Sequence, residues 1–185
     1  LLPSEITNRE MLGAAARNDL SALQQLFAAD KPPHVRYTDE RRRSALHLAV
    51  KHGPLVPEPE HKKVIKLLLE KGRSSKIQHS SDLRGRTAMH FAAASDNSAA
   101  VVTLHQAGCQ LSAPDREGIT PLEVACNVGS TGTAEILLSQ LSADMKVEPE
   151  TLAQIAEQAI GFRNGKLLKA LHAHRARTLL QLDVN

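Results

Sequence analysis

Few segments of this 185-residue chain place residues at the spacing that catalysis or ligand binding requires. The nearest case is residues 161–167, Gly-Phe-Arg-Asn-Gly-Lys-Leu, because glycines followed by lysine are typical of a loop that cradles phosphate groups. This loop is one residue too short between its glycines, and Leu167 stands where a hydroxyl would hold a metal ion. We therefore do not expect a nucleotide site here.

Histidine and cysteine offer no stronger candidate for chemistry. His172 and His174 lie close together, but no cysteine pair or His-Glu-x-x-His sequence supplies the other ligands of a metal site. Cys109 and Cys126 are the two cysteines, and we expect both to be reduced and buried as small hydrophobic residues. No Gly-x-Ser-x-Gly sequence surrounds a nucleophile. The sequence therefore predicts no enzyme activity, no cofactor, no metal site and no small-molecule substrate.

A pattern does recur along the chain, in residues 39–50, 82–93 and 115–126. Each copy begins with aspartate, and Asp115 follows Asp82 by 33 residues. Within each copy a hydroxyl residue stands three positions before a polar residue, and an apolar run follows. Stacked helix-turn-helix units require a period of this length and this order of residue types.

The hydroxyl of each copy stands where a helix is expected to begin. Ser44, Thr87 and Thr120 can each accept a hydrogen bond from a backbone N–H that has no partner within the helix. Residues 120–123, Thr-Pro-Leu-Glu, form the best helix start, because Pro follows the cap and Glu can complete a capping box.

Small residues at fixed positions are expected to shape the turns and the packing. Gly85 and Gly118 supply a left-handed backbone to the turn between units. Arg42 occupies that position in the earliest copy, where it should cost about 1 kcal/mol. An alanine in each copy lets the first helices of neighbouring units approach closely: Ala49, Ala92 and Ala125.

Apolar residues at helical spacing predict a second helix in each unit, around residues 64–69, 100–104 and 134–138. We expect Gly72 and Gly108 to end the first two of these helices with a positive φ. Leu141 occupies that position in the last unit, so its helix is expected to end differently. Residues 12–27 form an amino-terminal cap, and residues 150–156 and 166–171 form a carboxy-terminal capping pair.

The sequence resembles the ankyrin-repeat family, because the Thr-Pro-Leu-His type of motif recurs with its Gly and Ala partners in register over most of the chain. The resemblance implies an all-α solenoid of stacked helix-turn-helix units joined by β-hairpin-like turns. It also implies that His47 and His90 hydrogen-bond within and between hairpins, and that the motif aspartates brace the turns: Asp39, Asp82 and Asp115. We expect one domain over residues 1–182, with a cap unit at about 8–38, repeats at 39–81, 82–114 and 115–147, and a capping helix pair at 148–182.

The repeat at 39–81 is ten residues longer than the period. Seven of the extra residues lie between its helices and three lie around residues 74–81. Prolines at 54, 57 and 59 argue against a continuous helix, so we expect residues 54–63 to form a loop on the side away from the hairpins. This loop is either a tolerated surface insertion or a docking loop.

Composition limits the class of protein. With 42% hydrophobic residues, 2% aromatic residues and no Trp, the core must consist of Leu, Ala, Val and Ile. No apolar run is long enough to cross a bilayer, and residues 1–5 are not a secretory signal. We expect an intracellular protein, cytoplasmic or nuclear. The absence of Met at position 1 suggests a segment of a longer polypeptide, and the terminal caps favour a monomer.

The resemblance implies a non-catalytic scaffold, because the family generally holds protein partners in a groove formed by hairpin tips and first helices. Guanidinium groups dominate its first three units here and favour carboxylate or phosphate groups on a partner. We therefore predict that the groove binds an acidic or disordered segment of another protein, with Leu83 and Ile119 as candidate apolar anchors. By register, the groove residues are Arg17, Glu40, Arg41, Arg43, Lys51, His52, Leu83, Arg84, Arg86, Ala94, Ser95, Arg116, Glu117, Ile119, Asn127 and Val128.

Other interpretations remain open. The net charge is only +3, so these arginines could equally be ordinary solvent-exposed residues that bind no partner. The chain could instead be the regulatory or substrate-targeting domain of a longer enzyme or channel. A second basic cluster, at residues 163–177, could bind phosphoinositides or nucleic acid. Both are the weaker predictions, because the scarcity of aromatic residues removes base stacking and because cations near a helix end already favour the helix dipole.

Overall fold

The structure is a computed structural model that describes residues 3–52 and 57–144, together with helical positions at 153, 156–157, 160–161, 165, 168–169 and 171–172. The predicted capping helix pair at 148–182 and the basic cluster at 163–177 therefore lie mostly outside the described residues.

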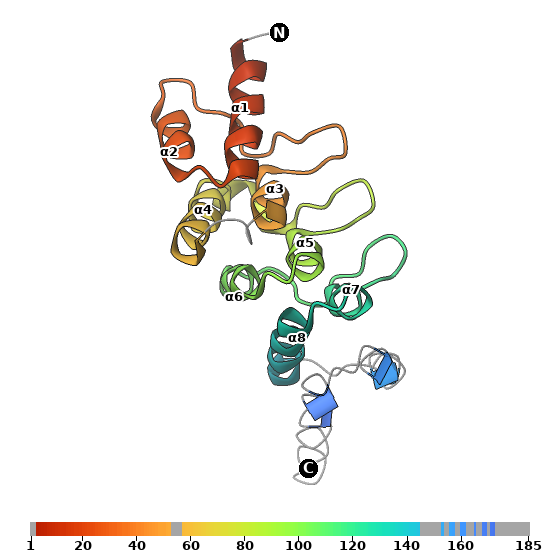
Figure 1. The fold of residues 1–185 in the computed structure, drawn as a ribbon. Helices are drawn as coiled ribbons and strands as arrows, with labels where there is room; N and C mark the ends of the chain where they lie inside the picture. The colour runs from red at the N-terminus through yellow and green to blue at the C-terminus, as the bar shows by residue number, and fades with distance from the viewer. Residues whose placement is uncertain are drawn as a thin grey trace.

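The described residues 3–144 form paired helices that stack along one direction (Figure 1). The helices are α1 (Pro3–Arg17), α2 (Leu20–Ala28), α3 (Ala45–His52), α4 (Glu58–Lys71), α5 (Ala88–Ala94), α6 (Ser98–Gln106), α7 (Pro121–Val128) and α8 (Thr131–Asp144), with short 3-10 helices η2 (Arg73–Ser75) and η3 (Ile77–His79). In this part of the chain, β pairing is confined to two isolated bridges, Thr38 with Ser44 and Ser81 with Thr87. This arrangement confirms the predicted all-α solenoid.

The helices form two layers. The first helices of the units, α1, α3, α5 and α7, contact one another in chain order, and the second helices, α2, α4, α6 and α8, do the same. The extended turns between units project to one side, away from the second layer (Figure 1). The three turns and the first helices α1, α3, α5 and α7 thus lie on the same side of the array.

Small residues permit the close packing of the first layer. Ala49, Ala92 and Ala125 have no exposed surface and belong to one continuous core cluster. The large core residues around them, such as Leu46, Met89 and Leu122, are also buried. Each fully buried large side chain contributes about 1.5–3 kcal/mol of hydrophobic stabilisation, so the continuity of this core across units holds the array together.

Two buried asparagines connect α3 to the units on either side. The side-chain Nδ2 of Asn18 donates to the carbonyl of Ala49 at 3.1 Å, and Nδ2 of Asn97 donates to the carbonyl of Val50 at 3.2 Å. The last carbonyls of a helix have no partner within it, so these bonds satisfy groups that would otherwise be buried unpaired.

The predicted helix start at residue 120 is confirmed. The backbone N–H of Thr120 donates to Oε2 of Glu123 at 2.6 Å, the Glu123 N–H donates to the Thr120 hydroxyl at 3.4 Å, and Pro121 is the first helical residue. The prediction for Leu141 is also confirmed, because α8 continues through this position to Asp144.

The predicted loop at 54–63 is wrong for residues 58–63, which belong to α4; residues 53–56 lie outside the described residues. Pro57 is the N-cap of α4 and Pro59 lies in its first turn, where backbone N–H groups need no partner within the helix. An ion pair between Lys62 and Glu58 spans this turn. The prolines therefore define the start of the helix and do not exclude it.

The prediction of a positive φ at Gly72 is also wrong, because its φ is −90°. A Cβ atom at this position would lie 2.1 Å from Cγ2 of Ile77, so glycine is required by the close approach of η3. The left-handed residue of this segment is Lys76, with a φ of 50°. Gly108 does have the predicted positive φ, 80°.

Candidate functional site

The three hairpin turns share one internal brace. Oδ1 of Asp82 accepts the backbone N–H groups of Arg84 at 2.8 Å and Arg86 at 2.9 Å. Asp39 and Asp115 accept the N–H groups two and four residues later in the same way. Each aspartate is therefore committed to holding its turn, as the sequence predicted, and is not a ligand-binding group.

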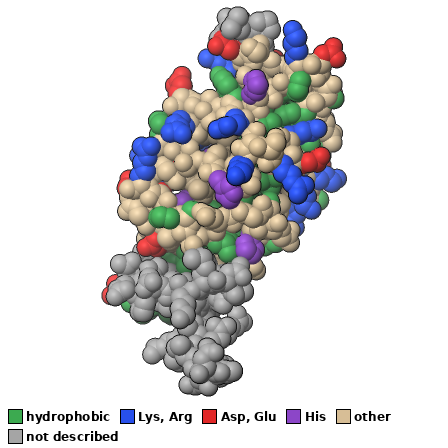
Figure 2. Space-filling view, turned by 180° about the vertical axis from the view of Figure 1, so that it is seen from behind, with side chains coloured by type: hydrophobic (Ala, Val, Ile, Leu, Met, Phe, Trp, Pro, Cys, Tyr) green, Lys and Arg blue, Asp and Glu red, His purple; other side chains and the backbone are tan. Residues whose placement is uncertain are grey.

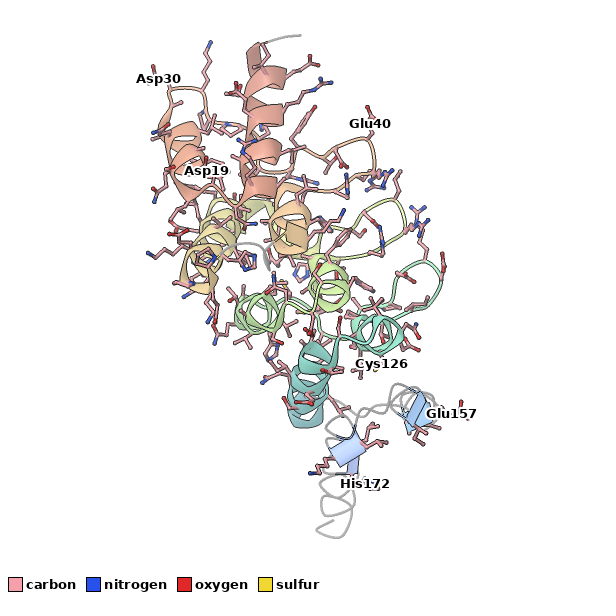
Figure 3. All side chains as sticks on the ribbon, in the orientation of Figure 1. Asp19, Asp30, Glu40, Cys126, Glu157 and His172 are labelled. Carbon is pink, nitrogen blue, oxygen red and sulfur yellow. The ribbon has the colours of Figure 1, made fainter. Side chains whose placement is uncertain are left out.

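Hydrogen bonds between neighbouring turns align their tips. The backbone N–H of Leu83 donates to the carbonyl of Arg41 at 3.0 Å, and that of Arg116 donates to the carbonyl of Arg84 at 2.9 Å. Figure 3 shows the side chains of the three tips projecting away from the helices, with Glu40 on the first tip. The tips therefore form a connected row along the array.

Close approach between two tips explains one of the turn glycines. Gly85 has a φ of 81°, and a Cβ atom there would lie 2.9 Å from the backbone N of Arg116. Gly118 has a φ of 82°, but a Cβ atom there would meet nothing within 4 Å. Arg42 adopts the same left-handed backbone without being glycine, with a φ of 58°.

The arginines of the predicted groove fall into two groups. Arg43 pairs with Asp39 at 2.6 Å, and Arg86 pairs with Asp82 at 2.7 Å. Although burial alone opposes it, the hydrogen bonds from these arginines and from backbone N–H groups lower the pKa of both carboxyls. The Arg86 guanidinium also lies 4.8 Å from the centre of the Phe91 ring. These two arginines are therefore already engaged within the fold.

The remaining tip residues face solvent. The side chains of Arg41, Arg84 and Arg116 are exposed, as are those of Glu40 and Glu117. Leu83 is 46% exposed, whereas Ile119 is partly buried and its carbonyl accepts a hydrogen bond from His90. Of the two predicted apolar anchors, Leu83 is thus the more available.

The first helices supply the other predicted residues. Lys51, Ala94, Asn127 and Val128 are exposed near the ends of α3, α5 and α7. The Ser95 hydroxyl donates to the carbonyl of Lys51 at 3.1 Å and so joins two neighbouring units. Arg17 is exposed at the end of α1, and the side chain of His52 lies outside the described residues.

His47 and His90 lie buried at the joints between units, and their predicted structural role is confirmed. Nδ1 of His47 accepts the N–H of Ser44 and its Nε2 donates to the carbonyl of Arg86 in the next turn, both at 3.1 Å. His90 forms the same pair of bonds, with Thr87 at 3.1 Å and Ile119 at 3.0 Å. Burial lowers the pKa of His47 to about 4 and also lowers that of His90, which favours the neutral rings that these bonds require.

The cysteines are free and buried, as predicted. Burial raises the pKa of Cys109 to about 12 and that of Cys126, which lies on α7 (Figure 3), to about 11. Thiols with such high pKa values are poor nucleophiles at neutral pH.

Within the described part of the chain, no group of three or more His, Cys, Asp or Glu side chains is arranged to hold a metal ion. None of the helices described has both the length and the apolar character of a membrane span.

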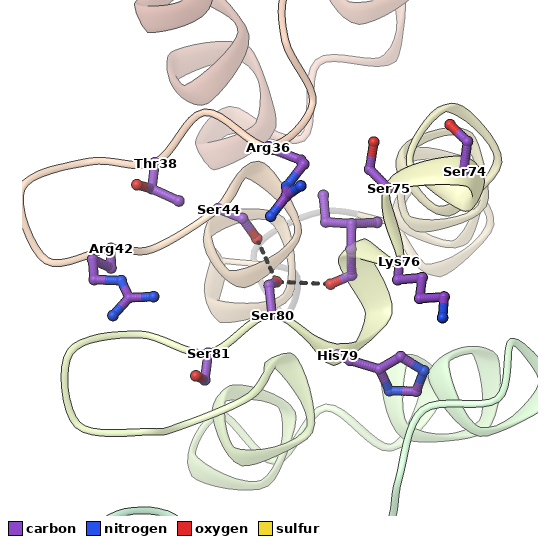
Figure 4. A pocket seen from close by; sticks show the side chains of 11 residues that line it. Arg36, Thr38, Arg42, Ser44, Ser74, Ser75, Lys76, His79, Ser80 and Ser81 are labelled. Atoms are coloured by element: carbon purple, nitrogen blue, oxygen red, sulfur yellow. Dashed lines mark hydrogen bonds between the residues drawn. The ribbon is translucent and has the colours of Figure 1, made fainter.

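A pocket that sequence reasoning missed lies between the turn at 38–44 and the η2–η3 segment (Figure 4). Its lining includes Arg36, Lys76 and His79, none of which was predicted as a site residue. The one sequence signal for it was the three-residue excess before Asp82, where η2 and η3 are found.

Comparison with known families agrees with this architecture. The sequence profile for ankyrin repeats (three copies) matches residues 11–115 and again residues 58–149. Together these matches cover both helical layers and all three braced turns. The chain therefore belongs to the ankyrin-repeat family.

Proposed function

We propose that this protein binds an acidic, extended segment of a partner protein along its row of hairpin tips. Ankyrin repeats generally mediate protein–protein interaction. The finer assignment is supported by one observation above all: Arg41, Arg84 and Arg116 are exposed on tips that hydrogen bonds hold in a row. Guanidinium groups in fixed positions pair with carboxylates through charge-assisted hydrogen bonds.

The pairing of side chains within the turns sharpens the proposal. Arg43 and Arg86 hold Asp39 and Asp82, so they position the tips and do not contact the partner. Glu117 is exposed on the last tip, so an acidic segment should lie mainly over the first two tips. Leu83, exposed between their arginines, would give such a segment an apolar contact.

The test is fluorescence anisotropy with a labelled peptide of Asp, Glu and Leu residues, and with a matched peptide in which Asn and Gln replace the acids. The double variant Arg41→Glu, Arg84→Glu should bind the acidic peptide at least about tenfold more weakly than the wild type, because opposed charges become like charges. The amide peptide should not bind measurably.

The matched control is Lys63→Glu, Lys66→Glu, which makes the same change of charge on exposed positions of α4 in the second layer. It should retain wild-type affinity. Equal weakening in both double variants would reduce the interaction to net charge and remove the claim for the tips.

A further inference from the structure

The pocket beside η2 and η3 has a volume of about 610 Å³, within the range of small-molecule sites. It lies at the end of α3 where Ser44 begins the helix, whereas the groove residue Lys51 is at the opposite end of that helix. The pocket therefore lies away from Lys51 but borders the first hairpin tip, where Arg42 of the pocket follows Arg41 of the proposed partner surface. Figure 4 shows side chains from the hairpin on one side and from the η2–η3 segment on the other.

The cations Arg36, Arg42 and Lys76 line this pocket together with the imidazole of His79, and no carboxylate does. Arg36, Arg42, Lys76 and His79 come from the segment before the hairpin, from its tip and from the η2–η3 segment. Within the part of the chain that is described, none of the four takes part in an ion pair. Figure 2 shows that Lys and Arg side chains also lie across the middle of the rear face, with acidic ones mainly at its edges.

Two of these cations adopt a strained backbone. Arg42 has a φ of 58° and Lys76 a φ of 50°, the left-handed region that favours glycine. The next two hairpins have Gly85 and Gly118 at the position of Arg42. A side chain in this conformation costs about 1–2 kcal/mol, and such strain is concentrated at binding sites. Of the four non-glycine residues with a positive φ in the described part of the chain, the two cationic ones line this pocket, whereas Asn18 and Asp96 do not.

Hydroxyl groups complete the lining. Ser80 donates to the carbonyl of Ile77 at 2.7 Å, and Ser44 lies 2.8 Å from Nδ1 of His47, so both are committed to the fold. The hydroxyls of Thr38, Ser74, Ser75 and Ser81 also line the pocket and have no side-chain hydrogen bond to other described residues. The pocket thus combines several cations with several available hydroxyls.

We propose that this pocket binds a small phosphorylated polyol, such as an inositol phosphate or a sugar phosphate. The cations pair with phosphate oxygens, and the hydroxyls bond to hydroxyls of the ligand. The lining has no aromatic side chain other than the imidazole of His79, so a nucleobase would find little to stack on. The pocket ligand would thus bind next to the partner surface, since Arg42 and Arg41 share the first hairpin tip.

The test is isothermal titration calorimetry with inositol trisphosphate, which compares the affinity of the wild type with those of the variants Arg42→Gly and Lys76→Gly. Each substitution removes a charge-assisted hydrogen bond and should weaken binding about tenfold. Because glycine relieves the left-handed backbone, the thermal unfolding midpoint should stay the same or rise, so lost binding cannot be attributed to misfolding. Lys66→Ala, an exposed position on α4, makes the same change of charge and should bind as the wild type does.

Two other ligands identify the chemistry. Inorganic phosphate and a phosphoserine peptide with neutral flanking residues should both bind more weakly than inositol trisphosphate, because neither carries a polyol. Tighter binding of the peptide would overturn the assignment to a small ligand. No heat of binding with about 1 mM inositol trisphosphate, or unchanged affinity in both glycine variants, would overturn the site itself.

Discussion

At the scale of the residue, two turn glycines with the same backbone conformation have different reasons to be glycine. Gly85 and Gly118 both have a φ near 80°, but only at Gly85 does the next hairpin leave no room for a Cβ atom. A side chain at Gly118 would therefore cost only the strain of a left-handed backbone, whereas one at Gly85 would cost that strain and a steric clash as well.

We predict that Gly118→Ala lowers the free energy of unfolding by about 1 kcal/mol, the cost of a left-handed alanine. Gly85→Ala should cost at least about 2 kcal/mol, because the Arg116 backbone must also move. Urea unfolding followed by circular dichroism measures both. Equal losses in the two variants would show that the contact between tips contributes nothing.

At the scale of the element, a fully buried alanine occurs on each of the first helices α3, α5 and α7. Helix α5 presents two alanines of opposite environment: Ala92 has no exposed surface and Ala94 is exposed. The helix lies between α3 and α7 and contacts both. Added volume at Ala92 must therefore displace at least one neighbouring helix.

We predict that Ala92→Leu destabilises the protein by about 1–3 kcal/mol or more, whereas Ala94→Leu changes stability by less than about 0.5 kcal/mol. Both variants add the same atoms to the same helix, so the comparison mainly reports burial; Leu has a helix propensity close to that of Ala, and the end position of Ala94 changes this little. Thermal unfolding of the pair measures the difference. If Ala92→Leu were as stable as the wild type, the first helices would have to be loosely packed around this residue.

At the scale of the whole molecule, buried histidines make the joints between units sensitive to acid. Burial lowers the pKa of His47 to about 4 and lowers those of His61 and His90 from the ordinary value of 6.5. The unfolded chain therefore binds more protons than the folded one below about pH 6.5. Stability is fully present above that pH and is lost as the pH falls toward 4.

We predict that the free energy of unfolding falls between pH 6.5 and pH 4, with His47 alone accounting for about 3 kcal/mol. Urea titrations at a series of pH values measure this slope. The slope of the unfolding free energy against pH gives the number of protons taken up on unfolding. In His47→Gln, which keeps a residue suited to the third position of a capping box, this number should fall by up to one. A slope that is the same in the variant would show that another group is responsible. Asp39 and Asp82, whose pKa values lie below 3.8, respond only at lower pH.

Much of the fold could be predicted because its signals are local. Asp82 bonds to the N–H groups of Arg84 and Arg86, and Thr120 bonds to Glu123. All these bonds join residues no more than four positions apart in the sequence. The residue types within such short segments determine these bonds. The same order of residue types in three copies therefore predicts both the turns and the helix starts. The candidate groove followed by register from the same repeat.

Only the tertiary structure reveals contacts between segments that lie far apart in the sequence. The side chain of Asn18 bonds to the carbonyl of Ala49, 31 positions away, and that of Asn97 bonds to the carbonyl of Val50, 47 positions away. The basic pocket depends on Arg42 and Lys76 lining its opposite sides, one on the first hairpin and the other between η2 and η3. The sequence by itself determined which units stack and where they begin, because backbone hydrogen bonding is local. Stacking decided which side chains remain available to a ligand, because availability depends on every neighbour that folding brings close.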